Sequence, residues 1–243
     1  MKNGEVDILV FDAHADDVEL SCGGTVLAAV ARKQKVGIID VTHGEMGTRG
    51  SPRERLRESQ SARKALGALF RERLDFGDGN LATGREQELQ LIEIIRRYRP
   101  SILIAPYPEE RHPDHVRTGR LVTDAWFYAG LRKIETAQPP HRPQAIVYYL
   151  QNYFPLPPSF VVDISAVFAK KMKAIACYKS QFYDPKSKEP QTMIAGKTFV
   201  AAIEGRARHF GAMIGAEFGE PFLTRQPPAV ADIVAAYKGR EVS

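Results

Sequence analysis

The sequence predicts an α/β fold with a Rossmann-like, mostly parallel sheet and helices on both faces. Short, continuous apolar runs, typical of strands buried on both faces, alternate with segments whose apolar residues recur at helical spacing. The alternation has the length of βαβ units, which specify a parallel sheet. A chain of 243 residues can form such a fold as one domain. We therefore predict a single domain over residues 1–243, with a less regular C-terminal part from about residue 181.

The predicted strands begin with DILVFDA at Asp7–Ala13, an apolar run bounded by polar residues. VGIID at the start of Val36–Val41 and SILIA at Ser101–Ala105 have the same character. Both are long enough for a buried strand and too short for a helix. A weaker third strand is predicted at Arg73–Phe76, and two further strands are predicted at Ala145–Leu150 and Phe160–Asp163.

Helices are predicted between these strands. One follows Gly23, Gly24 and Thr25 and ends near Gln34. In the next, Ser51 is a good N-cap, because its hydroxyl can accept a backbone hydrogen bond, and the proline after it suits the first turn. The remaining helices are Arg53–Leu69 after this cap, Gln87–Tyr98, Asp114–Tyr128 and Ser165–Tyr178, with up to two more beyond a loop-like stretch at residues 181–198.

Composition excludes several classes of protein. The net charge is +5, but Lys and Arg are mixed with Glu along helical segments, which disfavours a nucleic-acid-binding face. No apolar run approaches the ~18 residues of a membrane span, and Asp7 and Asp12 interrupt the first run, so we predict neither a signal peptide nor a membrane partner. Only two cysteines, Cys22 and Cys177, are present, and we expect reduced thiols in a cytoplasmic protein.

Polar clusters follow two of the strongest strands. His14, Asp16, Asp17 and Glu19 come directly after the first strand, and the run HPDH at 112–115 comes after the fourth. Ligands of open α/β sheets bind beyond the carboxyl ends of the strands, and these two strands are neighbours in the common doubly wound order. We therefore expect the two clusters to meet.

These side chains suit a catalytic zinc ion, which takes three N or O ligands and keeps one open position. Two imidazoles and one carboxylate supply such a set, whereas magnesium or manganese would favour more carboxylates. Consecutive Asp16 and Asp17 cannot easily point the same way, and chemistry alone leaves open which one binds the metal. A dinucleotide site is disfavoured, because the chain has no G-x-G-x-x-G and the acidic residues would repel a pyrophosphate.

At this point the residues resemble a known family. AHADDVE at Ala13–Glu19 and HPDH at His112–His115 are similar to the paired signatures of the LmbE/PIG-L family of zinc-dependent N-acetylglucosaminyl deacetylases. The resemblance extends through residues 42–59, 105–115, 140–143 and 178–182, which look most like the bacillithiol-biosynthesis branch. That resemblance implies removal of acetate from N-acetylglucosaminyl-malate.

The resemblance also implies roles for the first cluster. His14, Asp17 and His115 resemble the zinc ligands, with one ion per chain. Asp16 resembles the general base that takes a proton from the attacking water. Many relatives carry Pro where this chain has Ala15, which makes the ligand loop less preorganised but removes no ligand.

The second cluster and three outlying residues complete the implied site. His112 matches the residue that polarises the acetyl carbonyl and protonates the leaving amine, and Asp114 matches the carboxylate that orients and charges that imidazole. Arg55 aligns with a substrate-contacting arginine. Arg142 is a second candidate for the carboxylates of malate, and His43 is expected to line the cleft because it follows the second strand. Three nearby arginines rival Arg55 in this role: Arg49, Arg53 and Arg57.

Two other functions compete with this one. The same site fits a deacetylase of another N-acetylglucosamine-containing substrate, such as a chito-oligosaccharide or a thiol conjugate. A non-catalytic sugar-binding protein would not need the base and the His–Asp pair formed by Asp16, His112 and Asp114. Because relatives often assemble, we also expect a homo-oligomer whose only other partner is its amino-sugar substrate.

Overall fold

The computed structural model describes all residues except 1–3, 152–155, 184–186 and 238–243. Its strands are β1 (Ile8–Asp12), β2 (Val36–Asp40), β3 (Phe70–Arg73), β4 (Ile102–Pro106), β5 (Ala145–Tyr149), β6 (Phe160–Asp163) and β7 (Gly219–Thr224). They form one sheet in the order β3-β2-β1-β4-β5-β7-β6. The first five strands are parallel to their neighbours, whereas β7 is antiparallel to β5 and β6. The predicted α/β class is thereby confirmed.

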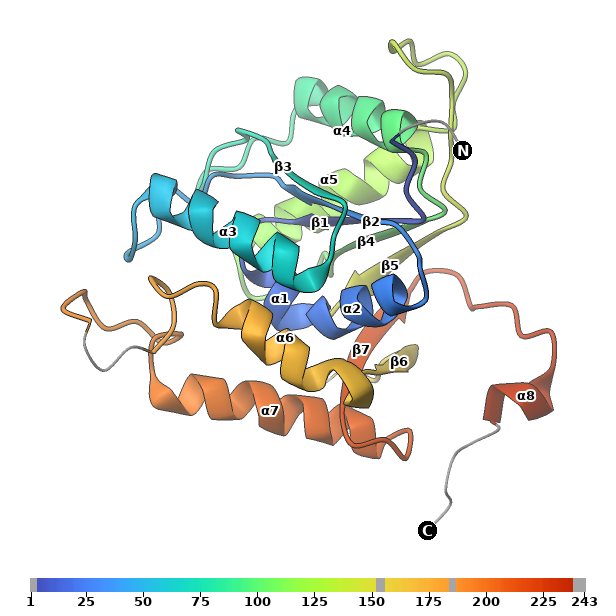
Figure 1. The fold of residues 1–243 in the computed structure, drawn as a ribbon. Helices are drawn as coiled ribbons and strands as arrows, with labels where there is room; N and C mark the ends of the chain where they lie inside the picture. Colours follow the sequence, from blue (N-terminus) through green and yellow to red (C-terminus); the bar gives the residue numbers. More distant parts are fainter. Residues whose placement is uncertain (1–3, 152–155, 184–186, 238–243) are drawn as a thin grey trace.

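The helices are α1 (Asp17–Ser21), α2 (Gly23–Ala31), α3 (Pro52–Leu66), α4 (Arg85–Tyr98), α5 (Pro113–Tyr128), α6 (Phe168–Ile175), α7 (Lys197–Ala212) and α8 (Ile233–Tyr237), and a 3-10 turn, η1 (Ser165–Val167), precedes α6. Figure 1 shows α4 and α5 on one face of the sheet and α1, α2, α3 and α6 on the other. The longer α7 lies outside α6, and α8 extends away from the body. Within the described residues, every helix is too short or too polar to cross a membrane.

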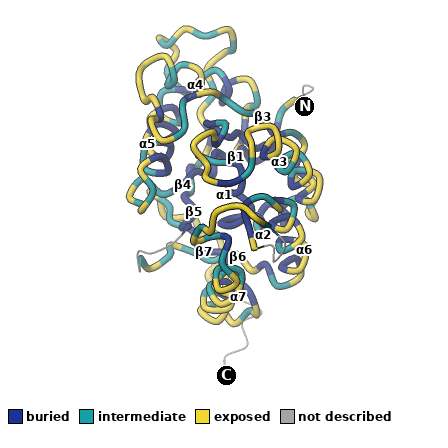
Figure 2. The backbone as a smooth tube through the Cα atoms, turned by 90° about the vertical axis from the view of Figure 1, so that its left-hand side faces the viewer, coloured by how far each residue is buried: buried dark blue, intermediate teal, exposed yellow. Residues whose placement is uncertain are grey.

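Two apolar cores separate the sheet from its two helical layers. Side chains alternate along a strand, so Ile8 and Val10 of β1 join the core under α2 and α6, whereas Leu9 and Phe11 join the core under α4 and α5. All five residues of β1 are buried. Figure 2 shows the same pattern along the chain: the central strands are buried, and exposed backbone lies on the outer helices and loops. This rigid centre positions the loops at the strand ends.

Two predicted elements differ from the structure. The third strand was expected at Arg73–Phe76 but is Phe70–Arg73. Its buried residue is Arg71, whose charge is paired inside the protein, so the strand lacks an apolar run. The strand β7 was not predicted at all, because its sequence GEPFLT contains a proline and a glutamate. It gives the C-terminal part, expected to be less regular, a strand in the sheet.

Other expectations are confirmed. The strands β1 and β4 pair directly, as the predicted strand order requires. Ser51 caps α3 in a reciprocal capping box with Glu54, and Pro52 occupies its first turn. Gly67 ends that helix in the left-handed conformation that glycine tolerates, with φ of +75°.

Candidate metal centre and active site

The loops after β1, β2, β3, β4 and β5 converge on one cleft at the carboxyl edge of the sheet. The cleft has a volume of about 340 Å³. It brings together the predicted residues His14, Asp16, Asp17, His112 and His115. Its other lining residues are Leu20, Met46, Gly47, Thr48, Arg49, Arg55, Asp78, Gly79, Arg111, Gln151, Gln181, Thr192 and Ile194.

A tight turn after β1 separates the two consecutive aspartates. The N–H of Asp17 donates to the carbonyl of His14 at 3.1 Å. Asp16 has φ of +155°, a conformation that few residues other than glycine adopt and that costs about 1–3 kcal/mol. As a result, the carboxylate of Asp17 faces His14 and His115, while that of Asp16 lies toward Arg55. The open question of which aspartate faces the imidazoles is therefore answered by geometry.

Three donor atoms converge at this point. Asp17 Oδ2 lies 3.5 Å from His14 Nδ1 and 3.2 Å from His115 Nε2. Donors held about 2.0 Å from one tetrahedral ion are about 3.3 Å apart, so this spacing fits zinc. A third imidazole, that of His112, also lies near, with one nitrogen of each ring within 4.8 Å of the others. The residues therefore fit a metal ion held by His14, Asp17 and His115, beside His112.

The other nitrogens of the two ligand rings are held by carboxylates. His14 Nε2 lies 3.0 Å from Asp78 Oδ1 and 3.6 Å from Asp114 Oδ2, and His115 Nδ1 lies 3.0 Å from Glu110 Oε2. Metal-binding histidines typically donate their second N–H to such a group, which fixes the tautomer and makes the free nitrogen a better ligand. This arrangement is an independent sign that His14 Nδ1 and His115 Nε2 face a cation.

The electrostatics of the cluster favour positive charge. Burial opposes protonation of His14, but the hydrogen-bonded carboxylates of Asp114, Asp17 and Asp78 outweigh it and raise the pKa of this imidazole well above its usual value. Burial likewise opposes ionisation of Asp17, but His115 and His14 hold the pKa of this carboxyl well below its usual range. Several ionised carboxylates thus surround a small volume, which a divalent cation would neutralise.

His112 is placed differently from the ligand histidines. It is the N-cap of α5, and its Nδ1 accepts the backbone N–H of Asp114 at 3.2 Å. Burial, with His115 and His14 nearby, lowers the pKa of His112. A neutral ring that accepts at Nδ1 carries its proton on Nε2, so it can donate a hydrogen bond to a ligand.

The structure gives Asp114 hydrogen-bond partners other than the expected imidazole of His112, although its charge opposes the lowering of the pKa of His112. The carboxylate of Asp114 does not hydrogen-bond to the ring of His112. It accepts the N–H of Gly79 at 2.8 Å, contacts Arg117 at 3.2 Å and faces His14. The reason is its position in the first turn of α5, where its backbone N–H, not its side chain, reaches the capping His112.

Arg55 and Asp16 form the opposite wall. Arg55 is buried, donates to the carbonyl of Gly44 at 2.9 Å and lies 3.8 Å from Asp16. Burial raises the pKa of Asp16 to about 7, although Arg55 opposes this shift. Of the residues predicted to contact substrate, Arg55 and its rival Arg49 line the cleft.

Arg142 and His43 are not brought to the cleft. The guanidinium of Arg142 lies 4.4 Å from the ring of Phe127 and donates to that residue's carbonyl at 2.8 Å. The loop that carries it packs against the end of α5 instead of turning to the strand ends, with His141 donating to Ala129. His43 follows β2 as expected, but its neighbours Met46 and Gly47 take the lining positions.

Sequence reasoning missed three residues that hold the ligands. Asp78 follows β3 and bonds to His14, Glu110 follows β4 and bonds to His115, and Gln151 follows β5 and donates to Asp17 Oδ1 at 2.7 Å. Each stands beyond the carboxyl end of a parallel strand, which is the signal that could have found them. Asp78 was hidden by the misplaced third strand, and its GDG turn carries positive φ at both glycines.

Comparison with known proteins places this geometry in a family. Residues 9–126, which contain the candidate ligands His14, Asp17 and His115, match the family model described as PIG-L, GlcNAc-PI de-N-acetylase. The chain is 32% identical over 190 residues to the diacetylchitobiose deacetylase of Thermococcus kodakarensis, covering 72% of this chain and 70% of that protein. The chain belongs to the PIG-L family of metal-dependent N-deacetylases.

Solved structures of similar proteins agree with this PIG-L assignment. The conserved protein TT1542 from Thermus thermophilus has a TM-score of 0.85 and 38% identity, covering 94% of this chain and 98% of that one. The N,N'-diacetylchitobiose deacetylase from Pyrococcus horikoshii has a TM-score of 0.80 and 26% identity, covering 93% of this chain and 86% of that one. The PIG-L fold therefore spans nearly the whole chain.

Proposed function

We propose that this PIG-L protein is a zinc-dependent hydrolase that removes the acetyl group from an N-acetylglucosamine unit. The observation that carries the proposal is the convergence of His14 Nδ1, Asp17 Oδ2 and His115 Nε2 in an open cleft, with Asp16 beside them. Their two imidazoles and one carboxylate are a ligand set that zinc prefers. When bound, such an ion supplies Lewis-acid activation of the amide carbonyl and of the attacking water.

The residues of the chain supply proton transfer and orientation. Asp16 is the general base that takes a proton from water as the water oxygen bonds to the acetyl carbon. Arg55, 3.8 Å away, keeps this carboxylate in place. His112 donates from Nε2 to the carbonyl oxygen, where negative charge develops. The C–N bond then breaks as the amine nitrogen takes from Asp16 the proton that this residue received from water, and acetate and the free amino sugar leave.

For the substrate itself, we propose N-acetylglucosaminyl-malate. Three arginines line the cleft, Arg49, Arg55 and Arg111, and guanidinium groups suit the paired carboxylates of malate. Arg49 is buried and contacts Ser187 and Glu189 at one side of the cleft. This basic wall supports a substrate whose aglycone is anionic.

Diacetylchitobiose is the second candidate, because the relatives from T. kodakarensis and P. horikoshii carry this substrate in their names. The zinc-loaded enzyme should be assayed for acetate release from N-acetylglucosaminyl-malate, diacetylchitobiose and N-acetylglucosamine. We expect kcat/KM to be at least about tenfold higher for the malate conjugate, equal to about 1.4 kcal/mol of transition-state binding. The reverse order would favour the chitobiose-type function. Release from none of the three by fully zinc-loaded enzyme would contradict deacetylation.

A pair of arginine variants tests the anionic aglycone directly. Arg111→Ala removes a cleft cation and should raise KM for the malate conjugate about tenfold, leaving KM for diacetylchitobiose unchanged. Arg142→Ala is the matched control, because its guanidinium lies on Phe127, and it should change neither value. Equal KM changes for both substrates in Arg111→Ala would remove the charge-based preference.

A further inference from the structure

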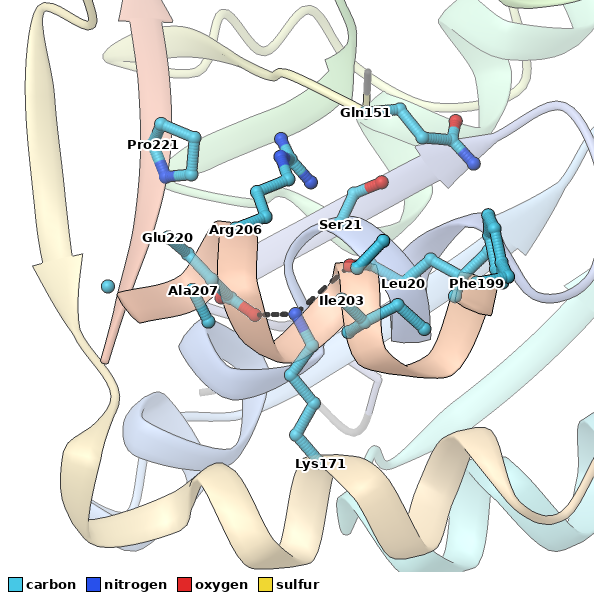
Figure 3. Close-up of a pocket in the computed structure, with 12 residues that line it drawn as sticks. Leu20, Ser21, Gln151, Lys171, Phe199, Ile203, Arg206, Ala207, Glu220 and Pro221 are labelled. Carbon is cyan, nitrogen blue, oxygen red and sulfur yellow. Dashed lines mark hydrogen bonds and ion pairs between the residues drawn. The ribbon is translucent and has the colours of Figure 1, made fainter. Parts of the chain in front are cut away.

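A small, separate cavity, drawn in Figure 3, adjoins the cleft that holds the candidate metal ligands. Its volume is about 30 Å³, enough for roughly two water-sized groups. Leu20 and Gln151 line both this cavity and the substrate cleft. Gln151 also donates to the metal-facing Asp17 at 2.7 Å. The cavity is therefore one side chain away from the proposed site of hydrolysis.

Arg206 reaches into this cavity from α7. Figure 3 shows its side chain extending toward the part of the cavity where Ser21 and Gln151 lie. The guanidinium of Arg206 lies 5.7 Å from the ring of Phe210, and it forms no hydrogen bond or ion pair with another described residue. Burial lowers the pKa of Arg206 to about 10, although the fields of Glu220 and Glu110 oppose this shift. Even so, Arg206 remains charged at neutral pH.

Glu220, the acidic residue that lines this cavity, already has hydrogen-bond and ion-pair partners. Glu220 Oε1 lies 2.6 Å from Lys171 Nζ and accepts the N–H of Gly24 at 2.8 Å. Its Oε2 accepts the N–H and the hydroxyl of Thr25, both at 2.6 Å. Lys171 and Glu220 neutralise each other. The positive charge of Arg206 is therefore not balanced by another residue that lines the cavity.

Two residues that line the cavity carry a polar atom without a partner. Ser21 Oγ and Gln151 Oε1 are buried and make no hydrogen bond within the described residues. A buried polar atom without a partner costs about 1–3 kcal/mol, so such groups normally mark a bound water or ligand. Phe199, Ile203 and Ala207 form an apolar wall of the same cavity. A ligand that satisfies these walls has an anionic end and a small apolar end.

We infer that the cavity is a binding site for a small monocarboxylate, with the carboxylate on Arg206 and Ser21 and the methyl group against Phe199 and Ile203. The size admits acetate or formate but no ring. The choice of acetate rests on the proposed function, because acetate is the product released on the other side of Gln151. The cavity then provides acetate with a position apart from the metal ligands.

Thermal denaturation of the zinc-loaded protein in sodium acetate tests the site. Acetate at ten times its Kd should raise the Tm of the wild type by about 3–5 °C. Arg206→Met removes the charge while keeping the bulk, and it should lose this shift. Arg208→Met is the matched control, since Arg208 lies on the same helix but is exposed and pairs with Glu204 and Glu217. Sodium benzoate at equal concentration should give no shift that depends on Arg206.

A crystal structure of the zinc-loaded protein in sodium acetate would show directly whether acetate occupies the cavity. Acetate on Arg206 and Ser21 would support the site, and ordered water alone would overturn it. An acetate-dependent Tm rise of the same size in Arg206→Met would also overturn it, because acetate would then act elsewhere. If Arg206→Met does not fold, Arg206→Lys keeps the charge and should retain a reduced shift. Acetate binding is measured without substrate, so a failure of deacetylation and a failure of this site are distinguishable.

Discussion

Two clusters of buried charge lie near the carboxyl ends of the central strands, and they differ in how their charge is balanced. In the first, Arg71 of β3 is fully buried and bonds to Asp40 at 2.8 Å, Glu19 at 2.7 Å and Asp12 at 3.2 Å. It also donates to the hydroxyl of Tyr178 at 2.9 Å. This cluster, the Arg71 network, contains its own cation.

Burial shifts the pKa of two acids in the Arg71 network upward. Burial, together with the neighbouring Asp40, raises the pKa of Asp12 well above its usual value, and burial raises that of Glu19. Around the ligand histidines the opposite occurs, because burial is outweighed there and the pKa of Asp17 lies well below its usual range. Imidazoles, which are weak bases, are the groups that face this carboxylate. The comparison teaches that the Arg71 network is structural and balances its acids with a permanent cation, whereas the acids of the cleft face imidazoles, which can give up their protons to bind a metal ion.

Removal of a ligand should have the largest effect. His14→Ala takes away one of three donors, and we expect zinc to fall from about one to below about 0.1 per chain, with loss of acetate release. Metal analysis by mass spectrometry after gel filtration measures this. His141→Ala is the control, because its ring bonds to the carbonyl of Pro100 outside the cleft. Stoichiometric zinc in His14→Ala would remove this residue from the ligand set.

Loss of the base should separate chemistry from metal binding. Asp16→Asn keeps the shape and the three donors, so zinc should stay bound while kcat falls by about 10²–10⁴. Steady-state kinetics at saturating substrate measure kcat, and Asp124→Asn on the exposed side of α5 should be unchanged. Near-normal turnover of fully zinc-loaded Asp16→Asn would show that another group acts as the base.

Removing the cation of the Arg71 network should reduce the stability of the fold but not the binding of metal. Arg71→Met leaves three buried carboxylates without their cation, which typically costs about 3–5 kcal/mol. Urea denaturation of the zinc-loaded protein should show this loss as a lower midpoint. Arg73→Met, at the partly exposed end of the same strand, should change stability by less than about 0.5 kcal/mol. A stability change as small in Arg71→Met would contradict the structural role.

Replacing a carboxylate that hydrogen-bonds to a metal-ligand histidine should have the smallest effect of the four substitutions. Asp78→Asn preserves size but replaces the carboxylate 3.0 Å from His14 Nε2 with a neutral amide. We expect zinc affinity to fall about 10–100-fold, measured by competition with a chromophoric chelator. The exposed Asp75→Asn, three residues earlier, serves as the control. An unchanged affinity would mean that Asp114 alone holds this imidazole.

Part of the difference between the two clusters can be predicted from the sequence. The buried strands that carry His14 and His112 are apolar runs, and the clusters come directly after them, so their meeting is predictable from strand order. The Arg71 network is hidden, since FRER has no apolar pattern and was placed as a strand three residues late. The sequence also gives no sign that Arg142 lies on Phe127, because that depends on how its loop packs.

The sequence by itself determined the α/β class, the position of the site at the carboxyl edge of the sheet and the residue types that a metal ion requires. These follow from local periodicity and from chemistry within a few residues. Only the tertiary structure decided which ring nitrogen of His14 faces Asp17, that Asp114 turns to His14, and that Arg206 and Ser21 line one cavity. Such contacts join loops and helices far apart in the chain, and their partners are fixed only when the sheet brings those segments to one edge.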